Sequence, residues 1–179
     1  LRATAIKKAE KQLQDNPEQW AIYNENSNEN VNVEAGPGSG KTHVLTLKCA
    51  KLIYHQHVNP KSILVLAYNR AVVVELKSRL AKLFASLGLS RSASQLHVYT
   101  FHSLAKRVCG DSVLSGYEMN EWEGILLRTI INKPNDVRAA MPDLQYVFID
   151  EFHVVFANEF PAQFVNSARR QFRKRNAQL

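Results

Sequence analysis

Cysteine is scarce in this sequence, and long apolar runs are missing. The two cysteines, Cys49 and Cys109, stand alone in helix-like segments, which argues against a disulfide framework and against a metal site made of paired cysteines. We expect both thiols to be buried and reduced. No run approaches the ~18 apolar residues of a membrane span, and the first residues lack a secretory signal. These absences predict no membrane association and a cytoplasmic protein, or a nuclear one in a eukaryote.

Acidic residues are outnumbered by basic ones, 16 to 23, so the net charge is +7 and the pI about 9.5. This excess permits a polyanionic partner without proving one. Part of it lies in a terminal run that could equally be a solvated helix, at Arg169, Arg170, Arg173, Lys174 and Arg175. The length of 179 residues and the hydrophobic content of 45% suit one α/β domain, and no repeat or low-complexity segment is present.

Glycine is also infrequent, yet it is concentrated in one short stretch. This stretch follows the phosphate-loop pattern, which is Ala or Gly, four free positions, and then Gly-Lys-Ser/Thr. Its residues are Ala35, Gly36, Pro37, Gly38, Ser39, Gly40, Lys41 and Thr42. Glycines let the backbone approach phosphates closely, so that successive N–H groups can point at them. Lys41 would then neutralise the β- and γ-phosphate oxygens of ATP, and the Thr42 hydroxyl would hold Mg²⁺.

The neighbouring segments favour this interpretation over a surface turn. Val31 to Glu34 reads as a short strand before the loop, and His43 to His55 reads as a helix after it, with apolar residues on one face. Strand, glycine loop and helix in succession are the context that a phosphate loop needs.

Strand and helix patterns alternate along the rest of the chain. A continuous apolar run at 62–68 is typical of a strand buried on both faces. We expect a short strand at 96–100 and a second buried strand at 146–149. We expect helices at 3–15, 18–23, 70–87, 101–109, 118–130 and 136–141. This alternation predicts a parallel sheet covered on both faces by helices.

The strand at 146–149 ends in two carboxylates, Asp150 and Glu151. At the carboxyl end of a parallel strand, Asp150 could reach the coordination shell of Mg²⁺. Glu151 could orient the attacking water or take its proton. The alternative is a strand that simply ends at a polar turn. The phosphate loop earlier in the chain favours the functional interpretation over this alternative.

Several segments, in order, resemble the UvrD/Rep-type superfamily 1 DNA helicases. The segment from Asn16 to Gln19 is similar to their adenine-reading motif, and 35–42 corresponds to their phosphate loop. The resemblance implies that the Gln19 amide pairs with adenine, although an ordinary helix start would look the same. Relatives often carry an Arg near the base directly after the loop, and here His43 takes that position in the nucleotide site.

Two more segments resemble parts of these helicases that meet single-stranded DNA. One implies DNA contacts by Tyr68, Asn69 and Arg70, and Tyr68 could stack on a base or be a core aromatic at a strand end. The other contains the Thr-Phe-His-Ser signature and implies contacts from Thr100 and His102 to the DNA backbone. A plain Thr helix cap is the alternative for Thr100.

The resemblance implies an α/β fold of the P-loop NTPase class, a RecA-like lobe with a mainly parallel sheet flanked by helices. Residues 1–179 would form one ATP-binding domain with a small helical insertion around 110–142. A second RecA-like lobe, which carries Arg residues for the γ-phosphate, would be absent from this chain. In the family a Gln and an Asp follow the Asp-Glu pair, and here His153 and Val154 replace them. The resemblance implies that this Gln couples the state of the γ-phosphate to the binding of DNA, so the replacement puts that coupling in question.

The expected function is therefore the ATP-binding lobe of an ATP-dependent DNA helicase or translocase that moves on single-stranded DNA. The chain alone should bind ATP but should not unwind DNA. A degenerate nucleotide-binding switch without translocase activity is one alternative, which His153 and Val154 favour slightly. An RNA-acting helicase of the Asp-Glu-x-His type is another alternative, because residues 150–153 match that motif.

Overall fold

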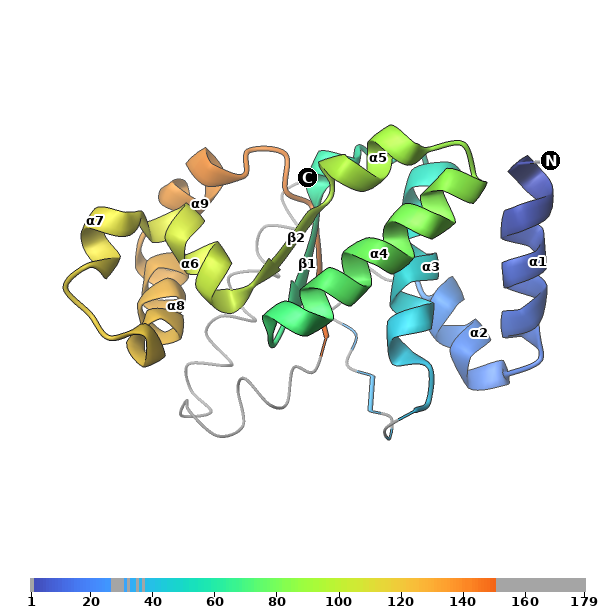
Figure 1. Cartoon of the computed structure of the whole chain (residues 1–179), viewed down its shortest axis with the longest axis horizontal. Helices are drawn as coiled ribbons and strands as arrows, with labels where there is room; N and C mark the ends of the chain where they lie inside the picture. Colours follow the sequence, from blue (N-terminus) through green and yellow to red (C-terminus); the bar gives the residue numbers. More distant parts are fainter. Residues whose placement is uncertain (1, 27–30, 32, 35, 37, 151–179) are drawn as a thin grey trace.

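A parallel sheet of three strands occupies the middle of the molecule (Figure 1). The computed structural model describes residues 2–26, 31, 33–34, 36 and 38–150. The strands are β1 (Ile63–Ala67), β2 (His97–Thr100) and β3 (Tyr146–Ile149), in the order β2-β1-β3. In the register, Val65 of β1 lies opposite Val98 of β2 and Phe148 of β3.

Helices surround this sheet and account for most of the described residues. In chain order the helical elements are α1 (Arg2–Gln14), α2 (Pro17–Asn24), α3 (Lys41–Tyr54), η1 (Pro60–Ser62), α4 (Arg70–Ser86), α5 (Ser90–Gln95), α6 (Phe101–Cys109), α7 (Asp111–Leu114), η2 (Met119–Glu121), α8 (Trp122–Asn132) and α9 (Pro134–Ala140). Several of them begin at side-chain caps. Asn16, Asn69 and Thr100 each accept a hydrogen bond from the backbone N–H three residues later.

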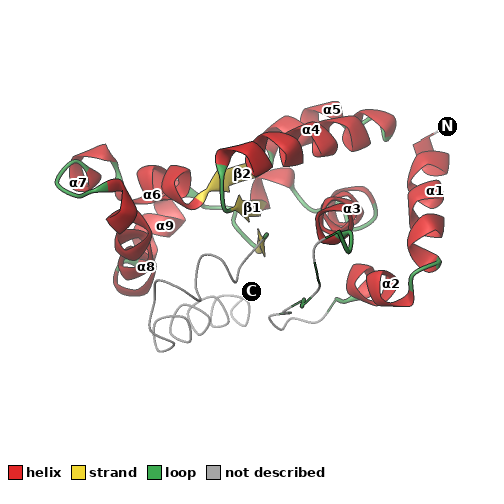
Figure 2. Ribbon diagram, turned by 60° about the horizontal axis from the view of Figure 1, so that its bottom comes forward, coloured by secondary structure: helices red, strands yellow, loops and turns green. Residues whose placement is uncertain are grey.

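The central strand separates two hydrophobic cores because its side chains alternate between the two faces of the sheet. Ile63 and Val65 pack with α3 and α4 on one face, whereas Leu64 and Leu66 pack with α6, α8 and α9 on the other. Figure 2 shows the strands between these two helical groups. All five residues of β1 are buried, as the apolar run predicts. The prediction of an α/β fold with a parallel sheet flanked by helices is therefore confirmed.

Two predictions about strands are wrong. Val31, Val33 and Glu34 do not lie in a strand, and the two valine side chains are 53% and 37% exposed. β-Branched residues favour strands through packing against neighbours, which exposed valines lack. The strand at 146–149 is present, but all its residues are only half-buried. Among the described strands β3 lies at one edge of the sheet, so it is less covered than β1.

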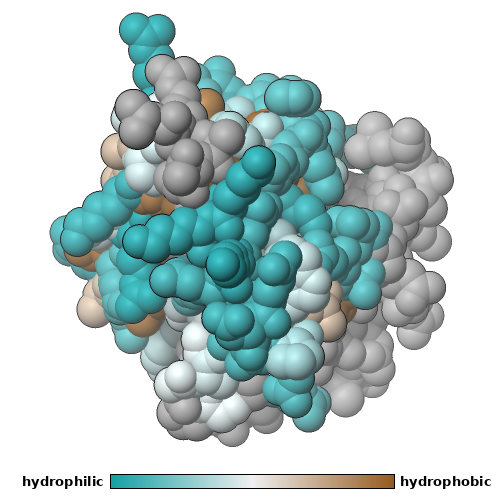
Figure 3. Space-filling view, turned by 90° about the vertical axis from the view of Figure 1, so that its right-hand side faces the viewer, coloured by the Kyte–Doolittle hydropathy of each residue, from teal (hydrophilic) through white to brown (hydrophobic). Residues whose placement is uncertain are grey.

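Both cysteines are free, but their burial differs. Cys49 is fully buried, and burial raises the pKa of its thiol to about 12, so it is unreactive. Cys109 is half-buried rather than buried, and its thiol donates a hydrogen bond to Thr129 Oγ1 over 3.4 Å. Among the described helices none combines the length and the apolar character that crossing a bilayer requires. The side of the molecule that carries α1 is mostly hydrophilic (Figure 3).

Helix α4 offers a direct test of the core next to β1. Leu76 is fully buried there, whereas Val74 on the same helix is 60% exposed. Leu76→Ala should lower the free energy of unfolding by about 2–5 kcal/mol, because it removes buried methyl groups and leaves a cavity. Val74→Ala, the matched control, should change it by less than about 0.5 kcal/mol. Urea titration followed by circular dichroism measures both, and equal effects would contradict this assignment of the core.

Candidate functional site

The carboxyl ends of the three strands meet at one edge of the sheet. Thr100, the last residue of β2, lies directly opposite Ala67, the last residue of β1, and Tyr68 follows Ala67. Asp150 follows β3, and its backbone N–H donates a hydrogen bond to the Leu66 carbonyl over 2.8 Å. The predicted site residues at the ends of β1, β2 and β3 therefore lie side by side, at the edge where parallel sheets bind ligands.

The first turn of α3 reaches the same edge. The Thr42 hydroxyl donates a hydrogen bond to Asp150 Oδ2 over 3.3 Å, between residues 108 positions apart in the sequence. The Asp150 side chain is almost completely buried, since the residue is 6% exposed. A hydroxyl and a carboxylate that converge in this way are the oxygen ligands that Mg²⁺ prefers, so these two residues fit a magnesium site.

The phosphate loop has the backbone that its glycines predict. Gly38 and Gly40 have φ of 75° and 85°, in the left-handed region that favours glycine. The loop turns tightly, with the Ser39 N–H donating to the Gly36 carbonyl over 3.3 Å. Lys41 Nζ donates to the same carbonyl, also over 3.3 Å, so the ammonium group lies across the loop. The Ser39 hydroxyl is buried without a hydrogen-bond partner among the described residues, which suits a polar ligand such as phosphate.

Gln19 contacts this loop through its side-chain amide. Its Nε2 donates a hydrogen bond to the Ser39 carbonyl over 2.8 Å. A Cβ atom added to Gly40 would lie only 2.8 Å from the same Nε2, so the amide rests against the loop backbone. Trp20, the next residue, is half-buried and stacks on Tyr23 with 5.6 Å between ring centroids.

His43 lies one residue after the loop threonine, in the first turn of α3. Desolvation lowers the pKa of its imidazole, and the positive charge of Arg79 lowers it further. His43 is therefore more strongly neutral at pH 7 than an ordinary histidine. It can offer a hydrogen bond to a nucleotide, but it does not supply the fixed charge of an Arg.

The residues after β1 are open to solvent. Tyr68 is 47% exposed, so the alternative that it is a core aromatic is wrong. Asn69 caps α4, with its Oδ1 accepting from the Val72 N–H over 2.9 Å, and Arg70 is exposed at the start of that helix. An exposed ring can stack on bases, and an exposed guanidinium group can bind phosphates.

The residues at the end of β2 and the start of α6 already make contacts within the chain. Thr100 Oγ1 accepts from the Ser103 N–H over 3.1 Å, so Thr100 is a helix cap. His102 Nε2 lies 3.1 Å from the Met119 carbonyl, and its Nδ1 lies 3.9 Å from Glu123 Oε1. Contrary to the usual exposure of glutamates, Glu123 is 8% exposed. This link from His102 to the helical segment at 110–142 has no sequence signal.

Some predicted site residues lie outside the described part of the chain. These are Ala35 and Pro37 in the phosphate loop and Glu151 after Asp150. His153 and Val154 also lie outside it. Their roles stay predictions.

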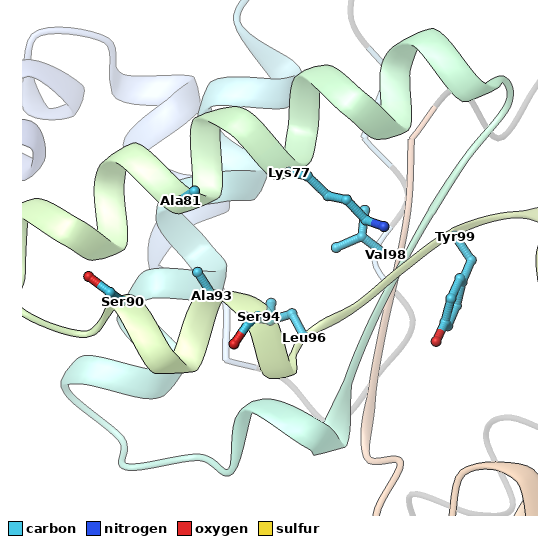
Figure 4. A pocket seen from close by; sticks show the side chains of 8 residues that line it. All are labelled: Lys77, Ala81, Ser90, Ala93, Ser94, Leu96, Val98 and Tyr99. Atoms are coloured by element: carbon cyan, nitrogen blue, oxygen red, sulfur yellow. The ribbon is translucent and has the colours of Figure 1, made fainter.

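Two further features of the fold have no motif in the sequence. Lys48 and Lys51 of α3 donate hydrogen bonds to the last turn of α2, to residues more than 20 positions earlier in the sequence. A cavity of about 410 Å³ lies between α4, α5 and β2, where the Lys77 side chain extends from α4 toward Val98 (Figure 4). None of the residues that line this cavity belongs to the phosphate loop, so it is separate from the site described above.

Comparison with known proteins gives one family. Residues 15–121, more than half of the chain, match the family model of the UvrD/REP helicase N-terminal domain. The matched segment includes Gln19, the phosphate loop, and the residues after β1 and β2.

Individual relatives carry helicase names. A probable DNA helicase of Mycoplasma pneumoniae is 32% identical over 144 residues, which cover 73% of this chain and 26% of the relative. The ATP-dependent DNA helicase PcrA of Staphylococcus aureus is 32% identical over 113 residues, covering 63% and 14%. The ATP-dependent DNA helicase SRS2 of Saccharomyces cerevisiae is 38% identical over 78 residues, covering 44% and 6%. This chain thus spans about a quarter or less of the length of these relatives.

Proposed function

This chain belongs to the UvrD/REP helicase N-terminal domain family, and from that premise we propose that it is the ATP-binding domain of an ATP-dependent DNA helicase or translocase. The contact that carries the proposal is the hydrogen bond from Thr42 to Asp150 over 3.3 Å. It joins the end of the phosphate loop to the carboxylate after β3, at the sheet edge where α/β folds bind ligands.

Each candidate side chain has a role that its chemistry supports. Gln19 would pair with adenine, and the loop from Gly36 to Thr42 would bind the phosphates through its N–H groups. The Lys41 ammonium would offset the charge of the β- and γ-phosphates. Thr42 and Asp150 would hold Mg²⁺, which when bound neutralises charge that develops on the phosphate oxygens. Glu151 would orient the attacking water and accept its proton.

Single-stranded DNA is the proposed polymer. Tyr68, Asn69 and Arg70 are exposed and follow β1 at the sheet edge where β2 ends at Thr100, and we propose that together with His102 they would bind the DNA beside the nucleotide site. The net charge of +7 favours a polyanion. Thr100 would act through the helix N-terminus that it caps, since such termini bind phosphates.

The catalytic unit would contain more than these 179 residues. We propose that residues 1–179 form one domain with a small helical insertion around 110–142, which α7, η2, α8 and α9 fill. A second RecA-like lobe would close on the nucleotide and supply Arg residues to the γ-phosphate. The complete protein would work in the cytoplasm, or in the nucleus of a eukaryote.

The proposal predicts binding without turnover by the chain alone. The purified 179 residues should bind ATP weakly, and Lys41→Ala should remove that binding. Hydrolysis should be about 10³–10⁵-fold slower than in a complete helicase, because an arginine that stabilises the transition state is worth that much. Calorimetric titration with ATP and a phosphate-release assay measure the two quantities.

Polymer controls separate the proposed function from its alternatives. Single-stranded DNA at stated salt should bind the chain more tightly than RNA of the same sequence. Binding of ATP without binding of either polymer would favour a nucleotide-binding switch. Steady hydrolysis by the chain alone, lost in Lys41→Ala, would contradict the need for a second lobe.

A further inference from the structure

Two lysines of α3 hold the C-terminal end of α2. Lys48 Nζ donates hydrogen bonds to the Ile22 carbonyl, over 2.8 Å, and to the Glu25 carbonyl. Lys51 Nζ, one turn further along α3, donates to the Tyr23 carbonyl over 3.2 Å and to Asn24 Oδ1 over 3.1 Å. Both ammonium groups thus bind the last turn of α2, which the chain leaves at Glu25.

This arrangement satisfies a specific need of a short helix. The last carbonyls of a helix have no partner within it, and they form its negative end. α2 has eight residues and no basic residue in its last turn, so the compensating charge comes from α3. Lys51 also lies over the Tyr23 ring, 4.7 Å from its centroid. The buried Tyr23 packs on Val44 and Leu47 of α3. The two helices are therefore held together by an apolar contact and by the two lysine ammonium groups.

The same two helices carry the two halves of the proposed nucleotide site. α3 begins at Lys41, directly after the phosphate loop, and Lys48 lies about 10 Å further along its axis. Gln19 lies in the first turn of α2, and its amide donates to the Ser39 carbonyl over 2.8 Å. α2 is therefore tied at both ends, to the loop through Gln19 and to α3 through the lysines.

The contact with Ser39 also determines what the Gln19 amide can recognise. A carbonyl only accepts hydrogen bonds, so the NH₂ end of the amide must face Ser39. One N–H and the oxygen of the amide then stay available for a base. Adenine offers an acceptor and an amino donor, N7 and N6, in the arrangement that a Gln amide pairs with. Guanine offers two acceptors there, so its O6 would oppose the amide oxygen.

We propose that Lys48 and Lys51 are positioning residues for nucleotide selectivity: by fixing α2 on the phosphate-loop helix, they hold the Gln19 amide where it distinguishes adenine from guanine. This inference rests on the proposed function, because it needs a nucleotide at the phosphate loop. The lysines themselves do not touch the nucleotide. Their loss should change recognition of the base and leave recognition of the phosphates unchanged.

Three ligands and five variants test this. The ligands are ATP, GTP and inorganic tripolyphosphate, each titrated with Mg²⁺ into the 179-residue chain. Three variants remove the cations: Lys48→Met, Lys51→Met and the double substitution. Lys82→Met on the exposed surface of α4 is the matched control. Met keeps the apolar stem and removes the charge. Lys48→Arg with Lys51→Arg restores a cation at both positions. Circular dichroism melting establishes that each variant is folded.

We expect the preference for ATP over GTP to fall about tenfold in the double variant, while tripolyphosphate affinity changes less than about twofold. Lys51→Met alone leaves the Lys48 hydrogen bonds in place, so it should show a smaller loss. The Arg pair should recover most of the preference, and Lys82→Met should keep all of it.

The remaining outcomes separate this inference from the proposed function. An unchanged preference in a folded Lys51→Met or double variant would overturn the inference, and so would an equal loss of tripolyphosphate binding. A wild-type chain that binds tripolyphosphate without preferring ATP would overturn both the role of Gln19 and the inference. A wild-type chain that binds none of the three ligands would instead contradict the proposed function itself.

Discussion

Substituting alanine for Gly40 should reduce the affinity of the chain for ATP by about 30-fold to 1000-fold. Gly40 has φ of 85°, a conformation that costs a residue with a Cβ about 1–2 kcal/mol. The new Cβ would also lie 2.8 Å from Gln19 Nε2, so the amide would lose its hydrogen bond to the Ser39 carbonyl. Losing that bond at a partly buried site adds about 1–2 kcal/mol. The sum of about 2–4 kcal/mol gives the expected range of affinities.

Alanine substitutions at two other glycines of the loop separate the backbone strain from the collision with Gln19. Gly38 has φ of 75° but has nothing within 4 Å of an added Cβ, so Gly38→Ala introduces strain without a collision. Gly36 meets no atom within 4 Å and does not have a positive φ, so Gly36→Ala should show the smallest loss. Calorimetric titration with ATP should rank the losses as Gly40, then Gly38, then Gly36. Equal losses at all three positions would contradict the geometry of this loop.

The fold follows from sequence where a local signal is sufficient. Asn16, Asn69 and Thr100 begin their helices because an Asn or Thr side chain can accept the N–H three residues later, whatever surrounds it. The run at 63–67 forms the central strand because every residue in it is apolar. The half-burial of β3 depends on the order of the strands, which no local pattern contains. The exposed valines at 31 and 33 could not be predicted for the same reason. A β-branched residue favours a strand only where neighbouring side chains pack against it, and a short segment of sequence does not contain those neighbours.

The candidate site divides in a similar way. The approach of Asp150 to Thr42 was predictable, because a phosphate loop and a strand ending in carboxylates meet at one edge of a parallel sheet. The contacts of Lys48 and Lys51 were not, because their acceptors on α2 are mostly backbone carbonyls, which every residue carries. Only the docking of α2 on α3 gives these lysines their positions. The position of His102 was not predictable for the same reason, since its Nε2 pairs with the backbone carbonyl of Met119.

Asp150→Asn should remove most of the Mg²⁺ dependence of ATP binding while leaving metal-free binding almost unchanged. In the proposed site the Asp150 carboxylate would be a negative ligand of Mg²⁺, and an uncharged amide oxygen binds a hard cation less well. The expected loss of affinity for ATP with Mg²⁺ is about 10-fold to 100-fold, the cost of about 1.5–3 kcal/mol for a charge-assisted contact. Titrations with ATP in the presence of Mg²⁺ and of a chelator measure the two affinities.

Folding is the first control for this prediction, because Asp150 is 6% exposed and buried charges are expensive to alter. The Asn side chain keeps an oxygen that can accept the hydrogen bond from Thr42, so Asp150→Asn should melt near the wild-type temperature. Thr42→Val removes the hydroxyl and should weaken the same Mg²⁺ dependence, whereas Thr42→Ser should retain it. If Asp150→Asn binds ATP with Mg²⁺ as tightly as the wild type, then Asp150 serves only to hold α3 against β3, and the metal must have other ligands.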